Sequence, residues 1–316
     1  MPRSWNSVLR MLLLLVIAGT AWADLSVVGD KLTLDALIWT GAHWWRFEHA
    51  GLSQSEFAFE RAEALVGLTG YLSPVVSLRL SGDVSYLKPQ DLYVDLHWRS
   101  GLGLRAGQFL LPLGVDAMTE PDSQVLASSS FLAGYTKPAG TRDVGVLGSW
   151  EYSRFSASAA VVNGSGANAG DNNDRKDLCG RLAVRPLPSL DAVLALRAYY
   201  GWPDASDSLW RSTALEARIR RGPLELQAEF QNHLSRGARN NPAYLQAAWD
   251  VGPLEAVGRF DLVVPQRKRI EWMMDGGLNL RSLSDHFKVM VDCSYHRNYQ
   301  DNWGVLGFHF RLQAGL

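Results

Sequence analysis

The fold is decided by one alternating stretch, Val76-Ser77-Leu78-Arg79-Leu80-Ser81-Gly82-Asp83-Val84-Ser85-Tyr86. Apolar side chains occupy nearly all the even positions, and polar side chains occupy the odd ones. Because successive side chains of a β-strand point to opposite faces, one face of this segment is apolar and the other is polar. We therefore predict an extended strand over residues 76–86 with one face suited to lipid and one suited to water.

The same alternation follows at once over residues 91–99, where an apolar face formed by Leu92, Val94, Leu96 and Trp98 opposes a polar one. Soluble β-sandwiches also alternate, but their strands are usually about 5–6 residues long. Strands of about ten residues with charge on one side suit a barrel with lipid outside and water inside. The pattern predicts an all-β chain that forms a transmembrane antiparallel β-barrel.

The N-terminus has the features of a cleaved export signal. Arg3 and Arg10 form a positive region before a short apolar run over residues 11–17, and Ala21-Trp22-Ala23 is a small-residue cleavage site. The apolar run is shorter than the about 20 residues that a spanning helix needs, which disfavours the alternative of an N-terminal anchor. We predict a signal peptide over residues 1–23 and a barrel over residues 24–316, exported through the periplasm to the bacterial outer membrane.

Period-two segments recur almost to the end of the chain. The first runs over about 31–39; in the second, over about 57–69, Ala58 shares a face with Ala64 and Val66. A Gly-Pro turn occurs twice, at 222–223 and 252–253. The count is about sixteen strands, and 14 or 18 remain open alternatives; bacterial barrels of this kind have even numbers. Very short turns alternate with longer connections, as expected for periplasmic turns and external loops.

Charge and cysteine content exclude several other classes of protein. The chain has 31 basic and 32 acidic residues, and without Arg3 and Arg10 its net charge is about −3, which argues against a nucleic-acid partner. Cys179 and Cys293 fall on opposite strand faces, which disfavours a disulfide. No Cys/His spacing indicates zinc, and the polar segment 171–177 is better read as an external loop than as a calcium site. We expect no metal and no cofactor.

One connection is much longer than the rest, between the fifth and sixth predicted strands at residues 110–142. A loop of this length without its own secondary structure is usually functional or disordered. The interior of a sixteen-stranded barrel is wide enough for water, so an infolded loop can set the width of the pore. We predict that this third long loop folds into the lumen as the constriction.

Around this loop the sequence resembles the phosphate-selective porins of bacterial outer membranes (porins O and P). The resemblance runs from about residue 57 to 188. The matching segments are Phe59-Glu60-Arg61-Ala62, residues 107–114 (GQFLLPLG), 141–146 (TRDVGV), 163–166 (NGSG), 171–177 (DNNDRKD) and 180–186 (GRLAVRP). The resemblance implies a sixteen-stranded, trimeric porin whose third loop narrows the lumen, and it implies anion permeation along a ladder of arginines.

The predicted lumen faces carry both signs of charge. The basic residues are Arg61, Arg79, Arg105, Arg181, Arg218, Arg259 and Arg281, and the acidic residues are Glu63, Asp83, Asp95, Glu216, Glu229, Asp261 and Asp275. Rings of one sign select ions, whereas mixed walls select weakly. We expect Asp83 to form an ion pair with Arg79 on the same strand. Each lumen arginine has the alternative role of a cross-strand ion pair that stiffens the wall.

The candidate site residues follow from this list and from the loop. The candidates for pore-lining, anion-attracting cations are Arg61, Arg79, Arg105, Lys137, Arg142 and Arg181, and the acidic residues of the constriction loop are Asp116, Glu120 and Asp122. Arg61 and Arg105 are favoured among them because they lie on strands that flank or approach the loop.

The function expected from the sequence is that of a porin, not an enzyme. It would pass small hydrophilic solutes or ions by passive diffusion, with an anion or phosphate preference, and its other partners would be outer-membrane lipid and lipopolysaccharide. Two alternatives stay open: a lipid-hydrolysing barrel enzyme and a non-conducting barrel that anchors or assembles other proteins. The first would need a Ser/His pair near the lipid face, and no G-x-S-x-G motif is present.

Overall fold

The computed structural model describes residues 31–49, 51–119, 123–136, 142–187, 190–203, 208–266, 270–281, 287–298 and 303–315. The predicted signal peptide, residues 1–23, lies outside the described residues. No helix within the described ranges is long and apolar enough to cross a membrane.

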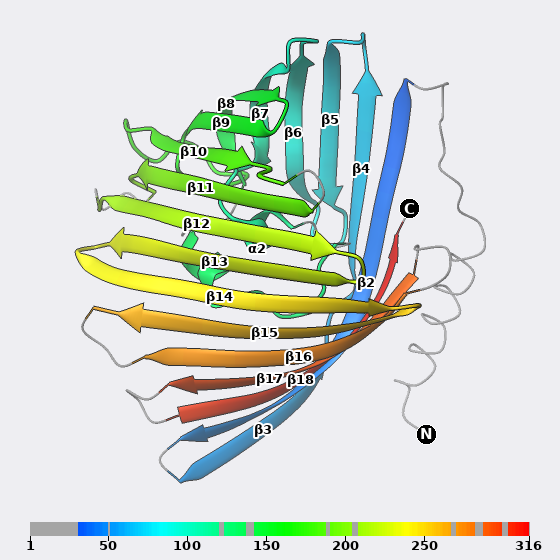
Figure 1. Cartoon of the computed structure of the whole chain (residues 1–316), viewed down its shortest axis with the longest axis vertical. Coiled ribbons are helices and arrows are strands. Elements are labelled where there is room, and N and C mark those ends of the chain that lie inside the picture. The colour runs from blue at the N-terminus through cyan, green and yellow to red at the C-terminus, as the bar shows by residue number, and fades with distance from the viewer. Residues whose placement is uncertain are drawn as a thin grey trace.

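The chain forms a closed antiparallel barrel in which each strand pairs with its neighbours in sequence (Figure 1). The strands are β2 (Leu32–His49), β3 (Leu52–Phe59), β4 (Glu63–Tyr71), β5 (Val76–Asp83), β6 (Lys88–His97), β7 (Leu102–Leu110), β8 (Arg142–Tyr152), β9 (Phe155–Val162), β10 (Asp177–Val184), β11 (Asp191–Gly201), β12 (Trp210–Arg221), β13 (Leu224–Ser235), β14 (Ala238–Val251), β15 (Leu254–Pro265), β16 (Glu271–Arg281), β17 (Phe287–Asn298) and β18 (Trp303–Gly315).

The barrel has sixteen strands, as the sequence predicts. β3 and β4 pair with successive halves of the long strand β2, so they are the two parts of one interrupted strand. β18 closes the barrel by pairing with β2 over residues 303–315. Closure leaves no barrel edge open to lipid, where unpaired backbone groups would be costly.

The alternation of apolar and polar residues in the sequence corresponds to the outer and inner faces of the barrel wall. Leu215 of β12 and Leu245 of β14 are 61% and 57% exposed on the outside, whereas Glu216, the next residue along β12, is 4% exposed on the inside. The outer apolar side chains continue around all the strands and form a belt, as a barrel in lipid requires. The predicted fold, an all-β transmembrane antiparallel barrel, is therefore confirmed.

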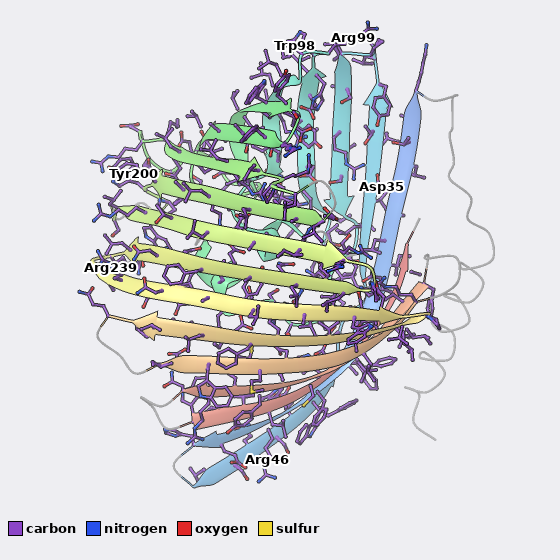
Figure 2. All side chains as sticks on the ribbon, in the orientation of Figure 1. Asp35, Arg46, Trp98, Arg99, Tyr200 and Arg239 are labelled. Atoms are coloured by element: carbon purple, nitrogen blue, oxygen red, sulfur yellow. The ribbon has the colours of Figure 1, made fainter. Side chains whose placement is uncertain are left out.

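The two ends of the barrel differ in their connections. The end where β2 begins and β18 ends has short links such as residues 153–154, 222–223 and 252–253, and we call it the turn end. The opposite end, the loop end, carries the connections between β7 and β8 and between β9 and β10, although residues 236–237 form a tight turn there too. Figure 2 shows Trp98 and Arg99 at the turn end and Arg239 at the loop end.

The repeated Gly-Pro turns form two-residue hairpins at the turn end. Gly222 and Gly252 have φ angles of 56° and 62°, which L-residues rarely adopt. A first turn residue with positive φ matches the twist of the flanking strands, so the register of β12–β13 and β14–β15 is set there.

Two expectations are wrong, one about which residues of a strand share a face and one about where a strand ends. The predicted continuous strand over 57–69 is broken at residues 60–62, and the extra residue reverses the facing: Phe57 and Phe59 point outward, 58% and 71% exposed, so Ala58 does not share a face with Ala64. The opening stretch also ends early, because β5 stops at Asp83 and residues 84–87 form a turn.

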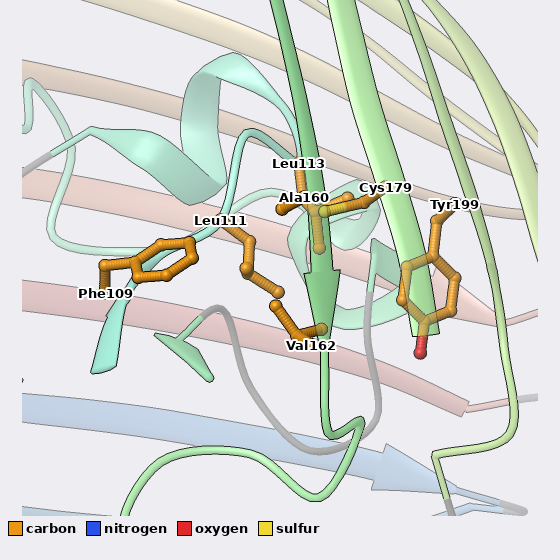
Figure 3. Packing of buried hydrophobic residues seen from close by; sticks show 7 residues of the cluster. All are labelled: Phe109, Leu111, Leu113, Ala160, Val162, Cys179 and Tyr199. Carbon is orange, nitrogen blue, oxygen red and sulfur yellow. The ribbon is translucent and has the colours of Figure 1, made fainter. Parts of the chain in front are cut away.

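A small apolar core lies where the long loop leaves β7 and turns inward (Figure 3). It packs the start of the loop against the inner wall of β9 to β11, and its members are Phe109, Leu111, Leu113, Ala160, Val162, Cys179 and Tyr199. Cys179 is buried in this core, whereas Cys293 follows the outward parity of Val291 on β17. Both cysteines are free thiols, as their opposite faces predict.

Candidate pore constriction

The third loop folds into the lumen, as predicted, and carries two short helices, α2 (Val115–Met118) and α3 (Phe131–Thr136). Figure 1 places α2 behind the strands β12 and β13 of the wall. Carboxylates of the wall accept hydrogen bonds from backbone N–H groups of the loop, at donor–acceptor distances of 3.2, 2.8 and 2.9 Å: Val115 to Glu229, Ala127 to Asp292 and Phe131 to Asp261. The inserted loop is therefore attached to three separate strands, β13, β15 and β17.

Arg259 of β15 is the centre of one of these attachments. Its guanidinium forms ion pairs with Asp261 at 2.8 Å and with Asp275 at 2.9 Å, and its side chain is 1% exposed. The same group donates to the carbonyl oxygen and to the hydroxyl of Ser128, both at 3.0 Å. A buried cation between two carboxylates thus holds the middle of the loop, so its role is structural.

Further along the wall, three side chains hold residues 124–127 of the loop. Arg311 donates to Oε1 of Gln124 at 3.0 Å and to the carbonyl of Ala127 at 3.2 Å. Asn279 donates to the carbonyl of Val125 at 2.8 Å, and Lys288 donates to the carbonyl of Gln124. None of these three was among the predicted site residues, because neither the loop's path nor its backbone acceptors are visible in a strand pattern.

A second buried network supports the start of α2. Arg197 of β11 is fully buried and binds Glu229 at 3.0 Å, Gln231 at 2.7 Å and Glu216 at 3.3 Å. Arg181, a predicted site residue, binds Glu216 at 2.8 Å. Arg197 was not among the predicted site residues, although the inward parity of β11 identifies it.

Arg79 finds a different partner from the expected one. It pairs with Asp35 of β2, which lies two strands away, and its Nη1 donates to Thr69 Oγ1 at 3.0 Å. Asp83 instead accepts from the backbone N–H of Ser85 at 2.8 Å and caps the turn after β5. The expected pairing of Arg79 with Asp83 is therefore wrong: β5 ends at Asp83, and its carboxylate is used by that turn.

Arg105 and Arg142 are both paired with acids of β6, which neighbours the strand of Arg105 (β7) and lies two strands away from that of Arg142 (β8). Arg105 binds Asp95 at 2.7 Å and lies over the ring of Tyr93, 4.1 Å from its centroid. Arg142 binds Asp91 through two nitrogens at 3.0 and 3.3 Å. These distances place both arginines in cross-strand ion pairs of the wall.

Arg61 lies at the break between β3 and β4. It donates to the carbonyl of Ser85 at 2.6 Å, and its guanidinium stacks on Tyr86 at 4.5 Å. It is exposed and does not line the main cavity described below. Of the remaining predicted site residues, Lys137, Glu120 and Asp122 lie outside the described residues, as does the side chain of Asp116.

The lumen between the inserted loop and the turn end is a cavity of about 800 Å³, the main cavity. Seven basic side chains line it, Arg79, Arg142, Arg218, Arg220, Arg259, Arg281 and Lys288. Five acidic side chains also line it, Asp35, Asp91, Glu225, Asp250 and Glu255. Asp250 lies 3.3 Å from both Arg220 and Arg281, so much of the basic charge is neutralised by nearby carboxylates.

Two titrating groups lie in loops outside the spanning strands. Burial, with a smaller contribution from Glu271, raises the pKa of Tyr135 in α3, so its phenol stays neutral at physiological pH. Lys176 lowers the pKa of Asp171 by hydrogen bonding to its carboxylate. Within the described residues no group of three or more His, Cys, Asp or Glu side chains is arranged to hold a metal ion.

Comparison with known proteins shows the fold. An anion-selective porin from Comamonas acidovorans superposes with a TM-score of 0.70 at 13% identity over 90% of this chain and 99% of that one. OprB of Pseudomonas putida gives 0.71 at 8% identity over 92% and 95%. The trimer form of OmpT, an outer membrane protein of Vibrio cholerae, gives 0.62 at 9% identity over 91% and 100%. No protein-family model and no curated protein sequence matches the chain.

Proposed function

We propose that the chain is a porin, a water-filled channel that passes small hydrophilic solutes and ions across the outer membrane by diffusion. One observation carries the proposal: a sixteen-stranded barrel holds a loop inside its lumen by hydrogen bonds from several strands, next to a polar cavity of about 800 Å³. A barrel that only anchors other proteins has no need of a constriction attached to its inner wall.

The selectivity that fits this geometry is a weak preference for anions. The main cavity has seven basic and five acidic side chains, so its excess of positive charge is small. Mixed walls make a transverse field and select weakly. The anion-selective porin of similar fold and the sequence resemblance both point to anions. Phosphate specificity has less support, because Arg79, Arg105, Arg142 and Arg181 are engaged by carboxylates.

Planar-bilayer recording of the purified chain tests this proposal. We expect stable single-channel steps, and a zero-current potential in a salt gradient that shows a permeability ratio modestly in favour of anions. Absence of conductance would reject the channel, and a cation-selective potential would reject the anion preference.

The proposal excludes enzymatic activity at the lipid face. A lipid-cleaving barrel needs a Ser/His pair near that face with an orienting carboxylate or amide. Among the described residues, His43, His296 and His309 follow the inward parity of their strands, and His43 lies 3.6 Å from Glu60 inside the barrel. A lipase assay on the same preparation should show no hydrolysis above the detergent blank.

We further propose that the protein assembles as a homotrimer, with its apolar belt against lipid and its loop end toward lipopolysaccharide. The trimer form of a porin-fold neighbour supports this assembly. Native mass spectrometry of the detergent-extracted protein should show three chains. A monomer that still conducts would reject the trimer and leave the channel proposal standing.

A further inference from the structure

The outer face of the barrel carries a small basic patch at the loop end of β12 to β14. Arg211 of β12 lies opposite Leu234 of β13, and Leu234 lies opposite Arg239 of β14, so the three residues form one row across the strands. Opposed Cα atoms of antiparallel strands are about 4.5–5.5 Å apart, which separates the Cα atoms of the two arginines by about 10 Å. We call these three residues the arginine patch.

The parity of the strands places the arginine patch on the outside of the barrel. Arg211 follows the parity of Leu215 on β12, which is 61% exposed, and Arg239 follows that of Leu245 on β14. The ladders of these strands keep one register between those positions, so no bulge changes the facing. Both arginines are exposed and point away from the lumen.

From the patch towards the turn end, the outer face changes from polar to apolar within two rows. Asn232 and Asn241 form the next row, in which Nδ2 of Asn232 donates to Oδ1 of Asn241 at 2.9 Å. The row after it is apolar and contains Leu215 and Phe230. Tyr200 lies opposite Arg211 on β11, with its ring outside at the loop end (Figure 2). Tyrosine is enriched at the level of the lipid headgroups, so the arginine patch lies at the margin of the apolar belt.

The outer face around the patch carries no acidic side chain that balances these two charges. Among the described residues, the side chains of β11 to β15 with outward parity include no Asp or Glu. Arg46 of β2 differs in this respect, because it is also exposed on the outer face but pairs with Glu48 at 3.0 Å. The arginine patch is therefore a site of uncompensated positive charge beside an apolar surface.

This combination suits a charged lipid better than a free anion. Guanidinium forks bind phosphate oxygens through paired, charge-assisted hydrogen bonds. Two forks side by side over Leu234 suit a headgroup that carries two separate phosphates. Exposed charges alone hold a free anion weakly, because water and salt screen them, whereas a lipid also packs its acyl chains against the belt below.

We propose that the arginine patch binds the headgroup of an outer-leaflet glycolipid with two phosphate groups, which is the chemistry of the lipid anchor of lipopolysaccharide. The acyl chains of this lipid lie against Leu215 and Phe230. The inference rests on the proposed orientation of the barrel, with its loop end outward, and not on conduction.

Native mass spectrometry of the full chain in non-ionic detergent tests the binding, with bisphosphorylated lipid A as the added probe. We expect the chain to retain one lipid A molecule. The variant Arg211→Gln/Arg239→Gln should bind it at least about tenfold more weakly, because two charge-assisted contacts are lost. Arg46→Gln is the matched control, since it removes an exposed outward arginine that Glu48 already neutralises, and it should bind as the parent does.

A second variant, Leu234→Glu, places a carboxylate between the two arginines and should weaken binding without removing either of them. Circular dichroism checks that each variant keeps the β-structure of the parent. Equal binding by the double variant, or no binding by the parent chain, would overturn the proposal.

Three further probes identify the part of the lipid that is recognised. Lipid A with a single phosphate should bind the parent at least about threefold more weakly, because one arginine loses its partner. Inorganic phosphate at the same concentration should not displace lipid A, and displacement would assign the patch to a free anion. Equal binding of phosphatidylglycerol would show a general attraction to anionic lipid, so either of these last two results contradicts the two-phosphate site.

Planar-bilayer recording separates this inference from the proposed channel. The double variant should conduct as the parent does, because the patch faces away from the lumen. A parent that binds lipid A without conducting rejects the channel and keeps the patch. A parent that conducts but retains no lipid A rejects the patch and keeps the channel.

Discussion

At the scale of single residues, buried charged side chains hold the inserted loop against the inner wall. Arg259 lies between Asp261 and Asp275 and also holds Ser128 of the loop. Removing one partner of a buried ion pair typically costs about 3–5 kcal/mol, because the other charge stays buried without compensation. We expect Arg259→Met to lower the free energy of unfolding by about 3 kcal/mol or more, measured by urea titration of the barrel in lipid vesicles.

The control for this prediction also removes one of the two carboxylates that Arg259→Met leaves without a cation. Arg259→Met combined with Asp275→Asn should recover part of the lost stability, because fewer uncompensated carboxylates remain. A loss below about 1 kcal/mol in the single variant would show that Asp261 and Asp275 do not need the guanidinium and would contradict the role given to Arg259.

Arg105 offers a test of whether a paired arginine still affects permeating ions. Arg105→Ala removes the positive charge that pairs with Asp95, so the carboxylate is left uncompensated and we expect the anion preference to fall. The change should be no more than about twofold in permeability ratio, because the pair is partly exposed and screened. The zero-current potential in a salt gradient measures it.

The matched variant Arg105→Ala/Asp95→Asn removes both charges and should return the permeability ratio close to that of the parent. If the single variant leaves the ratio unchanged, Arg105 acts only as a wall residue. A rise in anion preference would contradict the electrostatic argument altogether.

The sequence predicts which residues face the lumen better than it predicts their partners. The inward position of Arg79, Arg181 and Arg259 follows from the period of two alone. The partner of Arg79 is Asp35, 44 residues earlier in the chain, and this pairing depends on how β2, β4 and β5 are staggered. Strand stagger is a property of the closed barrel, so a pattern within one strand cannot contain it.

At the scale of elements, the long loop is the part of the chain on which the proposed conduction most directly depends. Replacing residues 123–135 by a short Gly-Ser linker removes α3 and the contacts with Asp261, Asp275 and Asp292 but leaves every wall ladder intact. We expect the single-channel conductance to rise at least about twofold, because the open lumen of a sixteen-stranded barrel is wide.

An equally conservative change in another loop serves as the control. A Gly-Ser replacement of residues 171–175, which lie in the β9–β10 connection and are mostly exposed, should leave the conductance near that of the parent. If the two replacements change the conductance equally, the third loop is not the constriction.

The break at residues 60–62 shows where prediction of elements from sequence fails. Alternation over 57–69 suggests one strand, but both Ala58 and the outward-facing Phe57 and Phe59 are apolar, so the pattern cannot distinguish the faces there. An inserted residue moves all later side chains to the other face. Alternation is unambiguous only where one face is charged, as over residues 76–83.

For the whole molecule, the division between an apolar outside and a charged inside fits both a barrel in lipid and the channel proposed for it. The outer belt makes the barrel stable in lipid. The charged inner wall is stable only because its arginines and carboxylates form ion pairs with each other or hydrogen-bond to the loop. The same pairing keeps the net charge of the main cavity small.

This division predicts opposite outcomes for one substitution on the two faces of β14. Leu245 is 57% exposed on the outer belt, and an arginine near the midplane of the bilayer costs about 2–4 kcal/mol. Ala248, on the same strand, lines the main cavity. We expect Leu245→Arg to lower the free energy of unfolding in vesicles by about that amount, and Ala248→Arg to change it by less than about 1 kcal/mol while raising the anion preference. Equal stability losses would mean that the outer face of β14 does not meet lipid, and a reversed order would contradict the assignment of inside and outside on which the channel depends.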